Sequence, residues 1–272
     1  MNKKSLFAVI LAGVMVATCV ACNKNASNQG ENTKVPGEFI EAAPEKPHFQ
    51  MMQREYPVAF TDSEQETVYV KGNLCKASVV AFDRVNSSIS KKINGVLKSA
   101  YERNDKNADA LMDVVMEVLA DDTFDESTAG FPWYLNSSYE LVKNDGLMLT
   151  FKENVEYFDG TNDVDEVFYY HFDAKTGDQV SQVMYTEGDD KQRDAIDKLI
   201  FDRLNEKYNG IVSYDYVSSS IVETAVDGWY FTDNGIMLTF NVGEVAPADA
   251  GTLEVELTKN ELPEFAQQYF LD

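Results

Sequence analysis

NDGLMLTF at residues 144–151 returns almost unchanged as DNGIMLTF at residues 233–240. Each copy contains an Asx-Gly pair, and such pairs adopt the positive φ angles of a tight hairpin turn at low energetic cost. Large apolar residues then recur at every second position, as in a strand with one buried face. The sequence therefore predicts two β-hairpins with type I′ turns at Asp145-Gly146 and Asn234-Gly235. Two origins remain open: convergence on hairpin chemistry, or two related halves of the chain.

Other segments of the chain have the periodicity of helices or strands. Apolar residues return every three or four positions in three segments, which are residues 83–104, 108–120 and 191–208. Strand-like runs are found at residues 57–60, 66–70, 76–82, 134–143, 147–158, 167–172, 179–185 and 252–257. Strands and helices are segregated rather than strictly alternating. We therefore predict an α+β fold of mainly antiparallel sheets with helices packed on one face, in two sequential subdomains that each carry one hairpin.

The amino-terminal residues have the features of an export signal. Lys3 and Lys4 precede an apolar run over residues 6–17, which is too short to span a membrane comfortably. The pair Ala21-Cys22 that follows resembles the bacterial lipobox. We predict that residues 1–21 are a lipoprotein signal peptide and that acyl chains such as palmitate are attached to Cys22. An ordinary secretory signal with an incidental cysteine is the alternative.

The predicted anchor is followed by a polar, proline-punctuated stretch. Residues 22–50 are rich in Asn, Ser, Lys, Glu and Pro, which is typical of a flexible linker. We expect two domains after it, at residues 51–187 and 188–272. The expected location is extracytoplasmic, with the lipid chains holding the protein to the outer membrane of a bacterial cell envelope.

The charge balance restricts the classes of partner. The chain has 46 acidic and 23 Lys or Arg residues, for a formal net charge of −23. Nucleic-acid binding requires a basic patch, so we expect no nucleic-acid partner. A cationic partner would be attracted, although acidic charge also keeps a tethered protein soluble.

Few residues carry obvious chemistry. Cys75 would be the single free thiol after lipidation, and we predict that it is a small buried residue rather than a nucleophile. His48 falls in the linker, and His171 is expected to be structural and to share a strand face with Tyr169. The motifs of nucleotide sites, zinc hydrolases and serine hydrolases are absent from the sequence. We therefore predict no catalytic residue, no cofactor and no metal.

The acidic run at residues 159–166 raises the question of calcium. An EF-hand loop has Gly at its sixth position and Glu at its twelfth. Counted from Asp159, these positions hold Val164 and Tyr170. We predict a solvated acidic loop and leave calcium binding open. The second acidic run, residues 187–190, is expected to lie at a helix N-terminus, where the helix dipole favours negative charge.

Two aromatic pairs are candidate ligand-binding residues. Trp133-Tyr134 and Trp229-Tyr230 each precede a predicted hairpin. A tryptophan in a groove can stack on a sugar or anchor a protein interface. Burial in the core is the alternative for these rings.

The C-terminal part resembles the C-terminal domain of the RsiV/PdaC-type family. The resemblance runs over residues 234–251 and into the strand at 255–257, and its centre reads GEVAPADAG at residues 243–251. Gly243 and Asp249 occupy positions where the family usually has Tyr. Upstream, Tyr56-Pro57 and FDAKTG at residues 172–177 resemble the partner domain of that family. The family's Gly-Gly-Ala-His stretch is replaced by GTND at residues 160–163, without the histidine.

The resemblance implies an extracytoplasmic two-part module. In the family this module accompanies a polysaccharide deacetylase domain, or serves as the lysozyme-binding sensor of an anti-sigma factor. We therefore predict a non-catalytic envelope lipoprotein that binds peptidoglycan, another glycan or a cationic protein such as lysozyme. The alternative is an envelope hydrolase of the glycosidase type with a carboxylate pair. The ligand, the membrane leaflet and the oligomeric state are left open.

Overall fold

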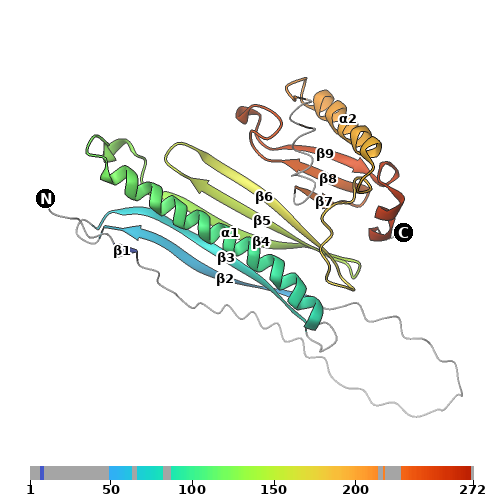
Figure 1. The fold of residues 1–272 in the computed structure, drawn as a ribbon, viewed down its shortest axis with the longest axis horizontal. Helices are drawn as coiled ribbons and strands as arrows, with labels where there is room; N and C mark the ends of the chain where they lie inside the picture. The colour runs from blue at the N-terminus through green and yellow to red at the C-terminus, as the bar shows by residue number, and fades with distance from the viewer. Residues whose placement is uncertain are drawn as a thin grey trace, which may run out of the picture.

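The computed structural model describes residues 7–8, 49–62, 66–81, 87–213, 217 and 228–270. These residues form two sheets, and a long helix packs against each of them (Figure 1). Most neighbouring strands are antiparallel, so the predicted α+β class is confirmed. Apart from Phe7 and Ala8, the predicted signal peptide lies outside the described residues, as do Cys22 and nearly all of the linker. Within the described ranges, no helix combines the length and the apolar character needed to cross a membrane.

The first sheet has the strand order β1-β2-β3-β4-β5-β6. Its strands are β1 (Phe7–Ala8), β2 (Phe49–Thr61), β3 (Val68–Ala81), β4 (Trp133–Asn144), β5 (Met148–Phe158) and β6 (Asp163–Asp173). All pairs are antiparallel except β3 and β4. A parallel pair requires a crossover connection, and the helix α1 (Ser87–Ala120) provides it, followed by the short 3₁₀ helix η1 (Glu126–Thr128).

The strands β2 and β3 are longer than the sequence predicts. Polar residues such as Gln53, Arg54 and Lys76 interrupt the apolar runs, and only short strands were expected there. The two strands nevertheless pair along their whole length, since their exposed face tolerates polar side chains. The linker prediction also ends two residues too late, because Phe49 begins β2 and is buried.

The helix α1 corrects the prediction of two helices at residues 83–104 and 108–120. It is one helix of 34 residues, and it packs mainly on β3. The interruption in its apolar stripe falls at Arg103 and Asn104, whose side chains bind the buried carboxylate of Glu153. The gap in the pattern is therefore a buried polar contact and not a loop.

The second sheet contains β7 (Trp229–Phe231), β8 (Gly235–Phe240) and β9 (Leu253–Thr258), in that order. The helix α2 (Asp190–Lys207) packs on β9, and Asp189 caps its N-terminus, as the acidic run predicted. Three 3₁₀ helices complete this part, η2 (Ala248–Ala250), η3 (Lys259–Glu261) and η4 (Glu264–Tyr269).

Both predicted hairpins are present, but the predicted type I′ turns are wrong. In the first hairpin only Gly146 has a positive φ, and the Asp145 carboxylate accepts hydrogen bonds from the backbone amides of Leu147 and Met148. In the second hairpin Thr232 pairs with Gly235 around a turn that begins one residue earlier than predicted. Gly235 is already in β8, where a Cβ would lie 1.9 Å from the Leu257 carbonyl oxygen. Close strand approach, rather than turn geometry, therefore requires this glycine.

The predicted strand at residues 179–185 is also wrong. A single bridge joins Phe172 to Gln179, and the apolar residues that follow enter the core of the second sheet. That core includes Val180, Val183 and Met184, together with Met148 from β5. The core of the second sheet therefore includes a residue of the first sheet, and the domain boundary at residues 187/188 stays a prediction.

Candidate functional site

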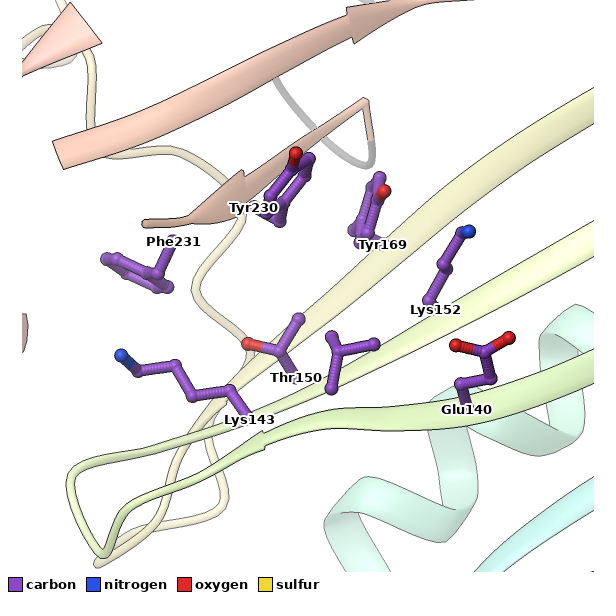
Figure 2. Close-up of a pocket in the computed structure, with 8 residues that line it drawn as sticks. Glu140, Lys143, Thr150, Lys152, Tyr169, Tyr230 and Phe231 are labelled. Carbon is purple, nitrogen blue, oxygen red and sulfur yellow. The ribbon is translucent and has the colours of Figure 1, made fainter. Parts of the chain in front are cut away.

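A pocket of ≈ 330 Å³ opens where the face of the first sheet opposite α1 meets β7 (Figure 2). Strands β4, β5 and β6 form its base, and β7 closes one side. It is lined by Glu140, Val142, Lys143, Thr150, Lys152, Tyr169, Tyr230 and Phe231.

The strand register brings these side chains to one face. Glu140 is the cross-strand partner of Lys152, and Lys152 is the partner of Tyr169, so the three form a row across the sheet. In the next row, a bulge pairs Lys143 with Thr150 and leaves Val142 as the extra residue. A bulge redirects side chains, and here both residues of the bulge line the pocket.

Thr150 of the pocket lining contacts a fully buried histidine, His171, which does not itself line the pocket. The Nε2 atom of His171 lies 2.7 Å from the Trp229 carbonyl oxygen, and its Nδ1 atom lies 3.0 Å from Thr150 Oγ1. A carbonyl can only accept, so Nε2 carries the proton, and Thr150 donates to Nδ1. Burial lowers the pKa of His171 to about 3, which keeps the ring neutral. The expectation of a structural histidine on one face with Tyr169 agrees with these contacts.

The charged residues of the pocket differ in their pairing. Lys143 Nζ lies 3.0 Å from Asp145 Oδ2 and over the ring of Phe231. Glu140 and Lys152 are neighbours on adjacent strands, yet no ion pair joins either of them to a described residue. Figure 2 shows Lys152 next to Tyr169, with Glu140 on the far side of Lys152 from Tyr230. The rings of Tyr169 and Tyr230 lie 4.9 Å apart and are tilted by 32°.

The other face of the first sheet holds a buried carboxylate. The Glu153 side chain is fully buried under α1. Its oxygens accept hydrogen bonds from Asn104 (2.7 Å), Tyr139 (2.5 Å), Tyr170 (2.7 Å) and Arg103 (2.6 Å). Burial raises the pKa of Tyr139, and the neighbouring Glu153 charge raises it further. The phenol therefore keeps its proton and stays a hydrogen-bond donor. This network fills the space between helix and sheet and is separate from the pocket.

Residues 185–260 match the family described as "Protein of unknown function (DUF3298)". Of the pocket residues, Tyr230 and Phe231 lie in this DUF3298 segment, and the other six precede it. This match covers the C-terminal part of the chain, for which the sequence shows a family resemblance, and the link to the RsiV/PdaC-type family itself stays a prediction.

Two crystal structures of DUF3298 proteins share the fold. One is a family member from Bacteroides fragilis NCTC 9343, with a TM-score of 0.56 and 10% sequence identity, covering 82% of this chain and 98% of that chain. The other is a family protein from Pseudomonas aeruginosa PAO1, with a TM-score of 0.52 and 11% identity, covering 82% and 96% of the two chains. The comparison with curated proteins found no match. The similarity therefore extends beyond the DUF3298 segment to most of the folded chain.

The two tryptophans expected at a ligand site are core residues. Trp133 is 5% exposed and donates its Nε1 hydrogen to the Ala129 carbonyl. Trp229 is fully buried and stacks on His171, with ring centroids 3.8 Å apart. Of the two interpretations of these tryptophans, burial in the core is the one that the structure shows, since packing covers both rings.

The two tyrosines of those pairs have different positions. Tyr134 lies on β4, and its hydroxyl donates to Asp163 at 2.6 Å, outside the pocket. Tyr230 lines the pocket. Of the four candidate residues, Tyr230 is therefore the one that the structure places in this site.

The remaining candidates of the sequence are accounted for locally. The Asp159 carboxylate accepts hydrogen bonds from the backbone amides of Thr161 and Asn162, and β6 begins directly afterwards. Within the described part of the chain, no group of three His, Cys, Asp or Glu side chains is placed to hold a metal ion. Cys75 is buried, as predicted, and burial raises the pKa of its thiol to about 11.

Sequence reasoning missed the row formed by Glu140, Lys152 and Tyr169. Pairing outward from the first hairpin turn approaches the Glu140–Lys152 pair, but the bulge after Leu141 shifts the register by one residue. No local signal places Tyr230 against Tyr169, because that contact depends on how the second sheet packs on the first.

Proposed function

We propose that this protein is a non-catalytic binding module of the bacterial cell envelope and that its pocket binds a glycan. The observation that carries the proposal is a pocket lining that combines the half-buried ring of Tyr230, packed on the buried Tyr169, with Glu140 and Lys152, which form no ion pair with any described residue. Ligand sites combine apolar or aromatic walls with a few convergent polar groups. Tyrosine rings can cover the C–H face of a sugar, and the charged heads can bind its hydroxyl groups.

The sequence supports the proposed cellular location and the proposed role at the cell wall. The signal-like residues 1–21, the lipobox-like Ala21-Cys22 and the polar linker support a lipid-anchored, extracytoplasmic module. The resemblance of the C-terminal part to the RsiV/PdaC-type family supports a role at the cell wall. We propose the outer membrane as the site of the anchor.

The test is titration of the full mature chain with soluble peptidoglycan fragments, followed by calorimetry. We expect saturable binding that is lost in Tyr230→Ala. The matched control is Tyr134→Ala, which removes a partly exposed tyrosine outside the pocket and should leave the affinity unchanged. Absence of binding by the unaltered chain, or equal loss in both variants, would contradict the pocket as a glycan site.

The hydrolase alternative receives no support from this pocket. Glycosidases use two carboxyl groups about 5–9 Å apart. Among the described residues that line the pocket, Glu140 supplies the one carboxylate. Chromatography of the same mixtures after long incubation tests the alternative, and release of smaller sugars would revive it.

A cationic protein is a second candidate partner, and the surface of α1 favours it. Asp105, Asp109, Asp113 and Glu117 recur every four residues, and all four are exposed. No Lys or Arg occurs in residues 107–142. An acidic surface of this kind attracts and orients a cationic partner such as a lysozyme-like protein. Retention of lysozyme on the immobilised protein at low salt, with release at moderate salt, is expected; lack of retention at both would exclude this candidate.

A further inference from the structure

We propose that the pocket selects a sugar that carries a carboxylate, with Lys152 as its charge partner and Glu140 as acceptor for its hydroxyl or amide hydrogens. This inference rests on the proposed glycan-binding function and specifies its ligand class. Lys152 is half-buried, and its ammonium group has no ion-pair partner among the described residues. By contrast, the other lysine of the pocket is already paired with Asp145.

The charge of the whole chain makes this lysine unusual. Acidic residues outnumber Lys and Arg by 46 to 23, so a carboxylate ligand is repelled by most of the surface. An unpaired ammonium group in a partly enclosed pocket is a place where such a ligand gains attraction. A charge-assisted hydrogen bond is also stronger than a neutral one.

The presence of Glu140 disfavours simple inorganic anions as the ligand of this pocket. A carboxylate only accepts hydrogen bonds, so the ligand must present donors to Glu140 and an acceptor with negative charge to Lys152. Inorganic phosphate or sulfate would bring negative charge against Glu140. A neutral sugar would satisfy Glu140 and leave Lys152 without its charge partner. An acidic sugar supplies both kinds of group on one ring.

The size and walls of the pocket agree with a single sugar unit. A volume of ≈ 330 Å³ is at the small end of ligand pockets. The half-buried ring of Tyr230 provides an apolar wall, which packs against the buried ring of Tyr169 (Figure 2). One acidic residue of a longer chain could therefore enter, with its neighbours outside.

The experiment compares N-acetylmuramic acid with N-acetylglucosamine, which lacks the lactyl carboxylate but has the same ring. Binding of each to the full mature chain is followed by NMR titration at low and at moderate salt. We expect the acidic sugar to bind at least about 5-fold tighter at low salt, as one charge-assisted contact allows. Salt should reduce this preference, since ions screen a partly exposed pair.

Three variants assign the preference to Lys152. Lys152→Met should abolish the preference while the neutral sugar still binds, and Lys152→Arg should keep it. The matched control, Lys175→Met, removes an exposed lysine in the turn after β6 and should change nothing. Alanine, which carries both charges without a ring, should not compete.

The outcomes separate this inference from the function on which it rests. If the unaltered protein binds neither sugar, the proposed glycan function fails. If it binds both sugars equally, glycan binding stands and the assignment of an acidic sugar is overturned. A preference that survives in Lys152→Met, or effective competition by alanine, would also overturn it.

Discussion

At the scale of single residues, burial determines the protonation state of His171. Its Nε2 atom is hydrogen-bonded to the Trp229 carbonyl oxygen and its Nδ1 atom to the Thr150 hydroxyl. The ring also stacks on Trp229. In the folded protein the pKa of His171 is about 3, below the ordinary value of 6.5, because burial disfavours the charged ring. Below about pH 6.5 the unfolded chain therefore takes up a proton that the folded chain does not.

This difference predicts how stability depends on pH. The contribution of neutral His171 is complete above pH 6.5 and is lost as the pH falls towards 3, by up to about 1.4 kcal/mol per pH unit. His171→Gln should be less stable at pH 7.5, and its deficit should shrink between pH 6.5 and 4. Urea unfolding of both proteins at several pH values measures this. A deficit that is constant with pH would show that His171 does not titrate as stated.

A second residue-scale prediction concerns Glu153. Its buried carboxylate accepts four hydrogen bonds, so Glu153→Gln turns an acceptor into a donor that faces other donors. We expect the free energy of unfolding to fall by about 3 kcal/mol, as when one partner of a buried charge network is removed. Glu156→Gln is the control, since that exposed side chain lies on the same strand and should change stability by less than about 0.5 kcal/mol. Equal effects in urea denaturation would mean that the network is not stabilising.

At the scale of elements, α1 combines a structural and a surface role. Its inward side packs on the first sheet and includes Ile93 and Leu97. Its outward side carries acidic residues four positions apart, and such like-charge pairs destabilise a helix. The acidic stripe thus opposes the stability of the helix that bears it.

The acidic residues on the outward side of α1 lead to a prediction about Asp113. Asp113→Lys replaces its repulsion from Asp109 and Glu117 by attraction, and we expect about 0.5–1 kcal/mol of added stability at low salt. Asp113→Asn, which only removes repulsion, should give about half of that gain. Both gains should decrease at high salt in urea unfolding. If a cationic protein binds this face, Asp113→Lys should also weaken its retention; a variant that is less stable at low salt would contradict the electrostatic argument.

At the scale of the whole molecule, the two sheets are joined by packing. Trp229 of β7 lies against His171 of β6, and the Val167 amide donates to the Asn241 side chain at 3.0 Å. Met148 of β5 belongs to the core of the second sheet. We expect the sheets to unfold together, because neither core is complete without the other part of the chain.

Trp229→Ala tests this cooperation. Removing a fully buried tryptophan should cost about 3–5 kcal/mol. The variant keeps a single tryptophan, Trp133, in the first sheet, so its fluorescence reports that sheet alone. Fluorescence and far-UV circular dichroism should give one common midpoint, shifted to lower urea. An unchanged Trp133 transition beside an earlier dichroism transition would show that the sheets unfold independently.

The sequence by itself determined several of the local elements. The hairpin strands predicted at residues 134–143 and 147–158 lie at Trp133–Asn144 and Met148–Phe158, and the helix predicted at residues 191–208 lies at Asp190–Lys207. Alternation, helical periodicity and capping are properties of neighbouring residues, so they can be read from the chain. The segregated order of strands and helices was sufficient to predict the α+β class.

Only the tertiary structure decided which side chains meet. The antiparallel pairing of β5 with β6 and the packing of β7 on β6 bring Lys152, Tyr169 and Tyr230 into one pocket, and the bulge after Leu141 sets which residues of β4 join them. Tertiary packing also covers Trp133 and Trp229 in two separate clusters, and the packing of α1 on the first sheet places Asn104 against Glu153. Contacts between residues far apart in the sequence depend on register and on the docking of whole elements, and no local pattern encodes them.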